Sequence, residues 1–280
     1  MSADTEGQYA TGLTRRNIEA ALIAAGRNPA ELAPADLHMM EDFHSLGRLA
    51  TAGLVGLAQV TATDRVLDAG TGIGGTARML ADEIGCAVTA IDMTEEYCAT
   101  AAWLNEATGL ADRITVLRAD VTELPFEDES FDVLISQHVQ MNVADKPRMY
   151  AEAHRVLAPG GRLALWDITA GPRQPILFPV PWADTPELSH LVTPEQLQQT
   201  TRAAGFETEV WNDLTDLAAQ GMQAVLGGEP NPLGIQVFVP GILTKGRNIV
   251  VNFNQERARV IQAVLRRPAS GGGAAATSST

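Results

Sequence analysis

Three aspartates stand at the ends of predicted strands. Asp68 ends the first strand just ahead of a glycine-rich turn, Asp92 ends the second, and Asp120 follows the third. In an open α/β sheet, ligands bind outside the carboxyl ends of the strands, so we expect these carboxylates to share one edge. A carboxylate repels a pyrophosphate and attracts an ammonium group. The pattern therefore predicts a site for a ligand with a cationic end.

The glycine-rich turn lies within residues 66–75, which read VLDAGTGIGG. Glycines let the backbone turn sharply from strand into helix and approach a ligand without a Cβ in the way. Because the same glycines satisfy a dinucleotide fingerprint, they leave an NAD(P)-dependent oxidoreductase open as an alternative. Asp68 disfavours it, as does the lack of a recognisable Tyr-x-x-x-Lys pair for hydride transfer. Asp92 follows about 20 residues later, where a carboxylate can accept hydrogen bonds from ribose hydroxyls.

Composition restricts the partners that we expect. The 280 residues carry a formal net charge of −14 and no run of Lys and Arg, which argues against a sequence-independent hold on nucleic acid. Neither a signal peptide nor a run of about 18 apolar residues is recognisable, so we expect no membrane association and a cytoplasmic location. Cys86 and Cys98 indicate no disulfide framework, which fits a reducing compartment.

Strands alternating with helices must position the three aspartates. Between Val66 and Asp167, short apolar runs alternate with helical periods, which is typical of βαβ units around a parallel sheet. The chain is therefore expected to have an α/β fold, with two more strands near its end. The predicted strands are Arg65–Asp68, Ala87–Asp92, Thr115–Ala119, Asp132–Ser136, Arg162–Asp167, Glu207–Trp211 and Val260–Arg266.

Helix boundaries follow from capping residues. Thr94 precedes two glutamates, so its hydroxyl is expected to cap a helix that ends near Gly109. A capping box with Pro at the first helical position starts a helix at Thr193. The other predicted helices are Arg16–Ala25, Asp42–Val60 and Asp145–Leu157, the last of them stopped by the turn Pro159-Gly160-Gly161.

These elements divide the chain into four regions: an N-terminal helical cap (1–60), a ligand-binding core (61–170), a substrate-side region with the last strands (171–267), and a tail (268–280). The tail is small, polar and Gly-rich, so we expect it to be disordered. The substrate-side region contains the apolar stretch NPLGIQVFVPGIL (231–243). Ordinary packing and a lid over a substrate pocket both account for such a stretch.

Several segments stand in a recognisable order between residues 60 and 170: VLDAGTGIGG, the acidic strand end AIDM, RADVTELPFEDESFDVLISQHV, and HRVLAPGGRLALWD. Together they resemble the class I S-adenosylmethionine-dependent methyltransferases. PFEDESFD is similar to the ubiquinone/menaquinone-biosynthesis type, and EDFHSLGRLAT and FPVPWADTPELSHLVTPEQL to the branch with sarcosine/dimethylglycine N-methyltransferases. The resemblance implies a Rossmann-like, doubly wound, seven-stranded sheet with an N-terminal helical cap and a helical insertion before the last strand.

The resemblance also implies the cofactor S-adenosylmethionine and the residues that bind it. The glycine turn would hold the methionine moiety, the second strand end the ribose and adenine, and the third the adenine edge. Residues of the N-terminal helices would close over the cofactor, with simple helix packing as the alternative. The implied cofactor-binding residues are Asp68, Ala69, Gly70, Thr71, Gly72, Asp92, Met93, Asp120, Val121, Gln137, Phe43, His44 and Gly47.

Methyl transfer from a sulfonium is an in-line displacement, so the protein must mainly align the reactants and exclude water. A base is needed only when the acceptor must lose a proton. His138 is the candidate catalytic base, with a structural histidine as the alternative, and Trp182 and His190 are candidate substrate contacts. We expect a small-molecule acceptor with an N, O or C nucleophile, and no metal. A homodimer and a non-catalytic S-adenosylmethionine-binding module stay open.

Overall fold

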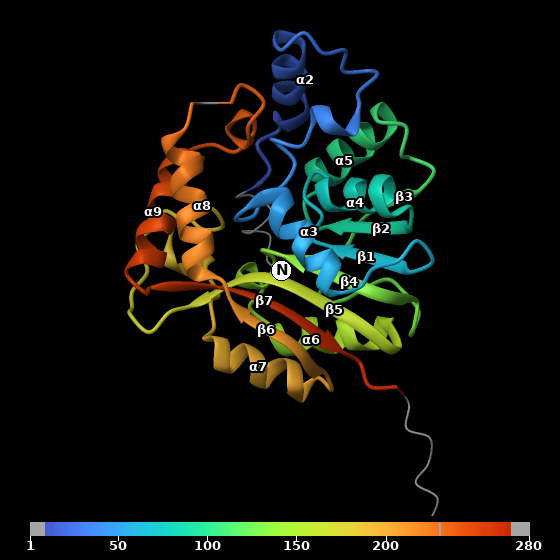
Figure 1. Ribbon diagram of the computed structural model, residues 1–280, viewed down its shortest axis with the longest axis vertical. Coiled ribbons are helices and arrows are strands. Elements are labelled where there is room, and N and C mark those ends of the chain that lie inside the picture. Colours follow the sequence, from blue (N-terminus) through green and yellow to red (C-terminus); the bar gives the residue numbers. More distant parts are fainter. Residues whose placement is uncertain (1–8, 230, 270–280) are drawn as a thin grey trace, which may run out of the picture.

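The computed structural model describes residues 9–229 and 231–269. Its centre is a seven-stranded sheet with the strand order β3-β2-β1-β4-β5-β7-β6, and helices cover both faces (Figure 1). This confirms the Rossmann-like α/β fold. The strands are β1 (Arg65–Ala69), β2 (Ala87–Asp92), β3 (Ile114–Arg118), β4 (Phe131–Gln137), β5 (Leu157–Ala170), β6 (Glu207–Asp213) and β7 (Ala258–Arg266).

The sheet is parallel except at β7. The pairs of β1 with β2, β1 with β4, β2 with β3 and β4 with β5 are all parallel, as the buried apolar runs predict. β7 runs antiparallel to both of its neighbours, β5 and β6. The sequence gives no indication of this reversal, because an apolar run has the same composition in either direction.

Helices pack on the two faces of the sheet. One face is covered by α3, α4, α8 and α9, whose apolar side chains meet Val66, Val133 and Val264. The opposite face is covered by α6 and α7, which meet Leu67, Leu134 and other neighbouring strand residues. The helices are α2 (Thr14–Ala24), α3 (Gly47–Leu57), α4 (Gly75–Met79), α5 (Glu95–Ala107), α6 (Lys146–Val156), α7 (Pro194–Ala203), α8 (Thr215–Gly227) and α9 (Ile242–Asn254), with short η1 (Pro34–Asp36), η2 (Leu80–Ile84), η3 (Gln140–Asn142), η4 (Pro186–Leu188) and η5 (Ile235–Val237).

The predicted caps are only partly correct. At α7, the Thr193 hydroxyl accepts from the Gln196 N–H and the Gln196 side chain accepts from the Thr193 N–H, which confirms the capping box. Thr94 stands at the N-cap of α5, but its side chain makes no capping hydrogen bond, so that expectation was wrong. The α6 helix ends at Val156, and the Pro-Gly-Gly segment that follows it is already part of β5, next to a shift in the pairing with β4.

The helix predicted for Asp42–Val60 was wrong at its beginning. The α3 helix starts only at Gly47, because Leu46 and Gly47 adopt positive φ values of 67° and 50°. Left-handed residues interrupt a helix, and the apolar periodicity of the sequence does not reveal them. Residues 41–46 therefore form a loop. It passes over the carboxyl edge of the sheet, at the entrance to the site described below.

The apolar insertion packs against the N-terminal helical region. Phe238 and Val239 are buried together with Ile18 and Leu22 of α2 and Tyr97 of α5. In Figure 1, the segment containing η5 lies beside α2 at one end of the sheet. The tail predicted to be disordered lies outside the described residues from position 270 on. Among the described residues, no helix combines the length and apolarity that crossing a membrane requires.

Candidate functional site

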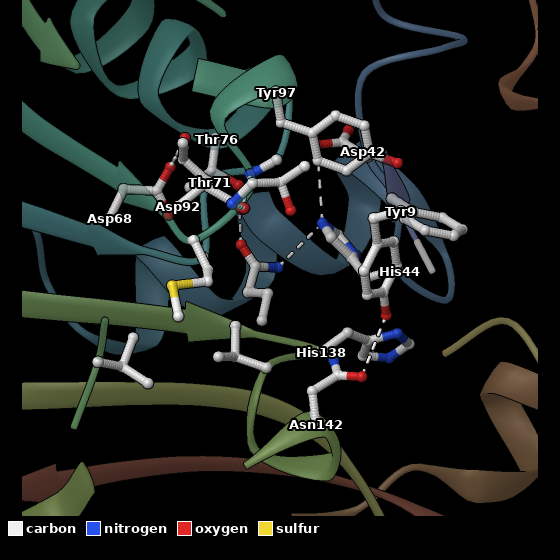
Figure 2. Close-up of a pocket in the computed structure, with 18 of the residues that line it drawn as sticks. Tyr9, Asp42, His44, Asp68, Thr71, Thr76, Asp92, Tyr97, His138 and Asn142 are labelled. Atoms are coloured by element: carbon white, nitrogen blue, oxygen red, sulfur yellow. Dashed lines mark hydrogen bonds and ion pairs between the residues drawn. The ribbon is translucent and has the colours of Figure 1, made fainter. Parts of the chain in front are cut away.

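A pocket opens at the carboxyl ends of β1, β2 and β4 (Figure 2). The glycine turn forms its floor, the loop 41–46 and Tyr9 lie across it, and the turn after β4 closes one side. The pocket contains residues that the sequence analysis predicted to bind a ligand and others that it did not indicate. Its lining is Tyr9, Glu41, Asp42, Phe43, His44, Asp68, Gly70, Thr71, Gly72, Thr76, Asp92, Met93, Thr94, Tyr97, Ala119, Val121, Gln137, His138, Val139 and Asn142.

Asp68 is the most deeply placed carboxylate of the pocket. It is 3% exposed, and its Oδ2 accepts a hydrogen bond of 2.6 Å from the Thr71 hydroxyl. Burial raises the pKa of Asp68 to about 6, although the bond from Thr71 opposes the rise. An ammonium group placed against this carboxylate would remove the cost of its burial, so the site favours a cationic ligand.

Asp92 holds the glycine turn in place. One carboxylate oxygen accepts from the Gly72 N–H at 2.9 Å, and the other accepts from the Thr94 N–H at 2.8 Å. Burial raises the pKa of Asp92, and these hydrogen bonds act against the rise. Each oxygen keeps a second lone pair, which can accept from a ligand hydroxyl.

Two glycines leave room for the ligand. Gly70 has a φ of +87°, and a Cβ there would overlap the Val139 side chain. Gly72 has a φ of +57°, and a Cβ there would meet no atom within 4 Å, so the space over this residue is open. Gly70 is required because a side chain there would clash with Val139 and because its φ is positive. Gly72 is required by its positive φ alone, since the space beside it is open.

Asp42 adds a third carboxylate, from the loop 41–46. Its side chain is 5% exposed, and its Oδ1 lies 3.6 Å from His44 Nε2. Its Oδ2 is buried and has no hydrogen-bond partner among the described residues. A buried carboxylate oxygen without a partner is costly, so this atom is suited to accept from a bound ligand. The sequence analysis missed Asp42 because it placed this residue in a helix.

His44 and Gln137 belong to one polar network above the turn. His44 Nδ1 lies 3.4 Å from the Ser45 carbonyl oxygen, and its Nε2 lies 3.1 Å from both Gln137 Nε2 and Thr51 Oγ1. The Gln137 carbonyl accepts from the Thr76 hydroxyl at 3.0 Å. Since the Gln137 amide donates to Nε2, His44 carries its proton on Nδ1. The network fixes the orientation of both side chains.

His138 is half-buried and lies beneath Tyr9 and beside His44 (Figure 2). Its φ is +54°, and its N–H donates to the Trp166 carbonyl at 2.8 Å. Its Nε2 lies 3.3 Å from the Ser45 hydroxyl oxygen, which accepts from Trp166 Nε1 at 3.0 Å. Burial lowers the pKa of His138 well below the usual value, with His44 contributing to the same effect. The imidazole is therefore neutral at neutral pH, and the burial that keeps it neutral also makes it a weaker base than a free histidine.

Known proteins place this geometry in a family. A model of the methyltransferase domain matches residues 67–165. Sarcosine/dimethylglycine N-methyltransferase of Halorhodospira halochloris is 30% identical over 214 residues, which make up 76% of this chain and 72% of that protein. The chain belongs to the class I S-adenosylmethionine-dependent methyltransferases. This methyltransferase is also similar to chloroplastic tocopherol O-methyltransferase of Arabidopsis thaliana, with 28% identity over 242 residues, 76% of this chain and 68% of that one.

The same fold occurs in an enzyme that is named for a reaction other than methyl transfer. The solved structure of the [4+2]-cyclase SpnF matches the methyltransferase with a TM-score of 0.65 and 22% identity, over 91% of this chain and 94% of the cyclase. The fold is shared with an enzyme that is named for another reaction, so the assignment comes from the sequence relatives. They give no support to a nicotinamide oxidoreductase or to a non-catalytic module. The chain is an enzyme that transfers methyl groups from S-adenosylmethionine to small molecules.

The pocket of the methyltransferase fits its cofactor. Asp68 and the unpartnered oxygen of Asp42 offer anionic acceptors for an ammonium group, and Asp92 offers lone pairs for ribose hydroxyls. Apolar groups for an adenine ring come from Met93 and Val121, which line the same pocket. No phosphate-binding cation is among the lining residues. The donor and acceptor set thus matches a cofactor with an ammonium, a ribose and an adenine and without a phosphate.

Some predicted site residues lie away from the pocket. Ala69 is buried in the hydrophobic core, and Gly47 begins α3 without lining the cavity. Asp120 is followed by a turn in which its carboxylate accepts from the Thr122 N–H and hydroxyl. Trp182 is buried in the core and donates to the Ser189 hydroxyl, and His190 is a half-buried residue whose carbonyl accepts from Lys146. None of these five lines either described cavity.

The remaining predicted residues lie at the pocket: Gly70, Thr71, Gly72, Asp92, Met93, Val121, Gln137, Phe43, His44 and His138, together with Asp68. Tyr9, Asp42 and Asn142 were not predicted. Tyr9 and Asn142 lie far apart in the sequence, and neither belongs to a motif, so no signal indicated them. In the part of the chain that the structure describes, no group of three or more His, Cys, Asp or Glu side chains could hold a metal ion.

Proposed function

We propose that Asp68, Asp42 and Asp92 bind S-adenosylmethionine at the glycine turn and that the acceptor approaches between His138 and Tyr9. The observation that carries the proposal is the meeting of the buried Asp68 with the part-buried Asp42 and Asp92 in one pocket, with open space over Gly72. Asp68 and Asp42 would bind the α-ammonium group, and Asp92 the ribose hydroxyls. Met93 and Val121 would contact the adenine.

When bound, the cofactor supplies a methyl group on a positively charged sulfur. An electron pair of the acceptor's N, O or C atom forms the bond to the methyl carbon while the carbon–sulfur bond breaks onto sulfur, giving S-adenosylhomocysteine. The residues of this chain align the acceptor and exclude water, which is the main contribution that such a displacement needs. Tyr9, Phe43 and His44 would cover the reacting atoms.

His138 would take the proton of an acceptor that has to lose one. Its imidazole is neutral and faces the pocket, so it can accept a proton without first losing one. The Ser45 hydroxyl, which accepts from Trp166 Nε1, lies within hydrogen-bond distance of Nε2 and orients the ring. An amine that is already neutral would need only alignment, and for such an acceptor His138 would be a positioning residue.

An amine acceptor and a phenol acceptor are the two classes that the experiment has to distinguish. The relatives are named for N-methylation of amino acids and for O-methylation of tocopherol. The test is incubation of the enzyme with methyl-labelled S-adenosylmethionine and a panel of amines, phenols and quinones, after calorimetry with S-adenosylhomocysteine and with NAD. We expect S-adenosylhomocysteine to bind and NAD not to bind. Preferred binding of NAD would overturn the proposal.

We also propose that the enzyme acts in the cytoplasm, which is in keeping with two buried thiols that form no disulfide, Cys86 and Cys98. A homodimer stays a prediction, and sedimentation of the purified enzyme at several concentrations tests it. The apolar insertion stays a candidate lid. Its contact with Tyr97 through Phe238, an edge-to-face ring pair with centroids 6.2 Å apart, supports that role.

A further inference from the structure

A second cavity, of about 470 Å³, lies next to the cofactor pocket. The two share one wall, formed by the rings of Tyr9, Phe43 and Tyr97. Tyr9 packs edge-to-face on Phe43 and at a tilt on Tyr97, with centroids 6.1 Å apart in both pairs. A cavity of this volume is in the range that holds a small organic ligand.

The other walls come from two segments outside the cofactor-binding core. The segment after β5 contributes Pro179 and Pro181, and the insertion before α9 contributes Val239 and Pro240. Asn248 of α9 donates to the Pro179 carbonyl at 2.9 Å and so joins α9 to the segment after β5. Seven of the eleven lining residues are aromatic, proline or valine, and they provide a surface for an apolar body beside the polar side chains of the remainder.

One ion pair stands in this apolar lining. Lys245 Nζ lies 2.8 Å from Asp184 Oδ1, and the two side chains differ in exposure: 12% for the lysine and 58% for the aspartate. Lys245 is the only cationic side chain that lines the cavity within the described residues. The aspartate can turn into solvent at little cost, whereas the lysine cannot, because most of it is buried.

We propose that the second cavity binds the body of the methyl acceptor and that the acceptor is an apolar molecule with a carboxylate, which Lys245 pairs with in exchange for Asp184. The inference rests on the proposed function. The acceptor's nucleophilic end would pass the Tyr9, Phe43 and Tyr97 wall and reach the cofactor pocket. A carboxylate at the far end then fixes how deeply the molecule enters.

Matched probes with one apolar body test the charge preference without turnover. Indole-3-propionic acid, its methyl ester and tryptamine carry a carboxylate, no charge and an ammonium group on the same ring. Each is titrated by calorimetry into the enzyme already saturated with S-adenosylhomocysteine. Saturation itself is measured first, so that failure of cofactor binding, which would contradict the proposed function, is separated from failure of the acceptor proposal.

We expect the acid to bind roughly tenfold or more tightly than the ester or tryptamine, as a charge-assisted pair in a largely buried site would give. Lys245→Met should abolish this preference, and Asp184→Asn should strengthen binding of the acid, because no carboxylate then competes. Arg247→Met, a change at an exposed α9 cation that does not line the cavity, should alter neither.

The proposal is overturned if the ester or tryptamine binds as tightly as the acid, or if Lys245→Met keeps the preference. It is equally overturned if the acid shows no binding at millimolar concentration to enzyme that binds S-adenosylhomocysteine. Thermal unfolding of each variant with bound S-adenosylhomocysteine checks that the fold is intact. A variant that fails this check is replaced by Lys245→Gln, for which the same outcomes apply.

Discussion

At the scale of single residues, burial and charge oppose each other in the cofactor pocket. Asp68 and Asp92 are carboxylates with pKa values raised by burial, and Asp42 has an oxygen without a partner. Each of them costs free energy of folding in the empty enzyme and regains it when a cation or hydroxyl arrives. The residues that bind the cofactor should therefore be those whose neutralisation stabilises the empty protein.

The first prediction concerns Asp68 and pH. With a pKa of about 6, Asp68 is protonated below pH 6 and loses its attraction for an ammonium group. We expect calorimetry to show that affinity for S-adenosylmethionine falls about tenfold from pH 7 to pH 5. Asp68→Asn should bind weakly at both pH values, with a smaller dependence on pH. Asp82→Asn, at an exposed position, should behave as the unchanged enzyme; a wild-type affinity that does not vary with pH would contradict the assignment.

The same pKa fixes the sign of a stability effect. The folded-state pKa of Asp68 lies above the usual value of 3.8, so the stability that this group contributes is present below about pH 4. It is lost as the pH rises through about 6. Asp68→Asn should therefore unfold at a higher temperature than the unchanged enzyme at pH 7, when no cofactor is present.

The second prediction concerns Asp42. Replacing it by Asn neutralises a buried carboxylate that has an unpartnered oxygen. We expect the empty enzyme to keep or raise its unfolding temperature, while affinity for S-adenosylhomocysteine falls by roughly tenfold, the value of one hydrogen bond to a charged group. Differential scanning fluorimetry and calorimetry measure the two effects. Unchanged affinity would show that Asp42 does not contact the cofactor.

The third prediction concerns His138. His138→Gln should lower kcat by about 100-fold or more for a phenolic acceptor, which must lose a proton, and by less than about tenfold for a neutral amine. Rates are measured with saturating S-adenosylmethionine for both acceptors. The control is His154→Gln, at a half-buried histidine of α6 that packs edge-to-face against Phe206. Equal losses for both acceptors would indicate a positioning role alone.

At the scale of elements, one buried carboxylate holds the turn that follows β4. Asp167 of β5 is fully buried, and its Oδ2 accepts from the Val139 and Gln140 N–H groups at 3.0 Å. Its Oδ1 accepts from its own neighbour Ile168. Since the turn carries His138 and Asn142 into the pocket, Asp167 links the sheet to the site without touching the ligand.

The fourth prediction follows from this link. Asp167→Ala leaves two buried N–H groups of the turn without an acceptor, which should cost about 3 kcal/mol in the free energy of unfolding. We also expect kcat to fall more than cofactor affinity, because the turn and not the glycine loop is released. Urea unfolding and steady-state kinetics measure the effects. Asp216→Ala, on the exposed side of α8, should change neither, and an equal loss in both variants would count against the link.

The elements of the core could be predicted because their signals are local. Six of the predicted strands begin and end within two residues of their observed bounds, whereas β5 extends beyond its predicted bounds at both ends, and a Thr with Pro and Gln indicated the start of α7. Most of the predicted residues that line the pocket follow these strands, and the family resemblance added Phe43 and His44. Asp42 and Tyr9 were missed because their positions depend on left-handed residues and on long-range packing. Trp182 and His190 were chosen by residue type. Trp182 is instead buried in the core, and the backbone carbonyl of His190 accepts a hydrogen bond from Lys146.

At the scale of the whole molecule, the net charge of −14 creates a field that all ligands meet. S-adenosylmethionine carries one more positive charge than S-adenosylhomocysteine, because its sulfur is a sulfonium. The field and the carboxylates that line the pocket therefore favour the cofactor over the product. Such a difference assists the exchange of product for new cofactor.

The fifth prediction is a difference in salt dependence. Raising the salt concentration from 20 to 300 mM should weaken binding of S-adenosylmethionine by roughly threefold and leave binding of S-adenosylhomocysteine almost unchanged, since salt screens charge. Calorimetry at constant pH measures both affinities. If both ligands weaken equally, the surface charge of the enzyme plays no part in selecting the cofactor.

The excursion between β6 and β7 has an evolutionary consequence. The end of β6 and the start of β7 are held together by the ion pair of Arg259 with Asp213 and by the hydrogen bond of Asn212 to Gln262. The pairing of the two strands is therefore complete before α8 begins. Within residues 214–257, the core-facing side chains of α8 and α9 are constrained because they cover one face of the sheet, whereas the cavity-facing side chains can diverge while the strands stay paired. Because this excursion supplies Val239, Pro240 and Lys245 to the second cavity, substitutions confined to it should change which molecules that cavity binds without changing the strands.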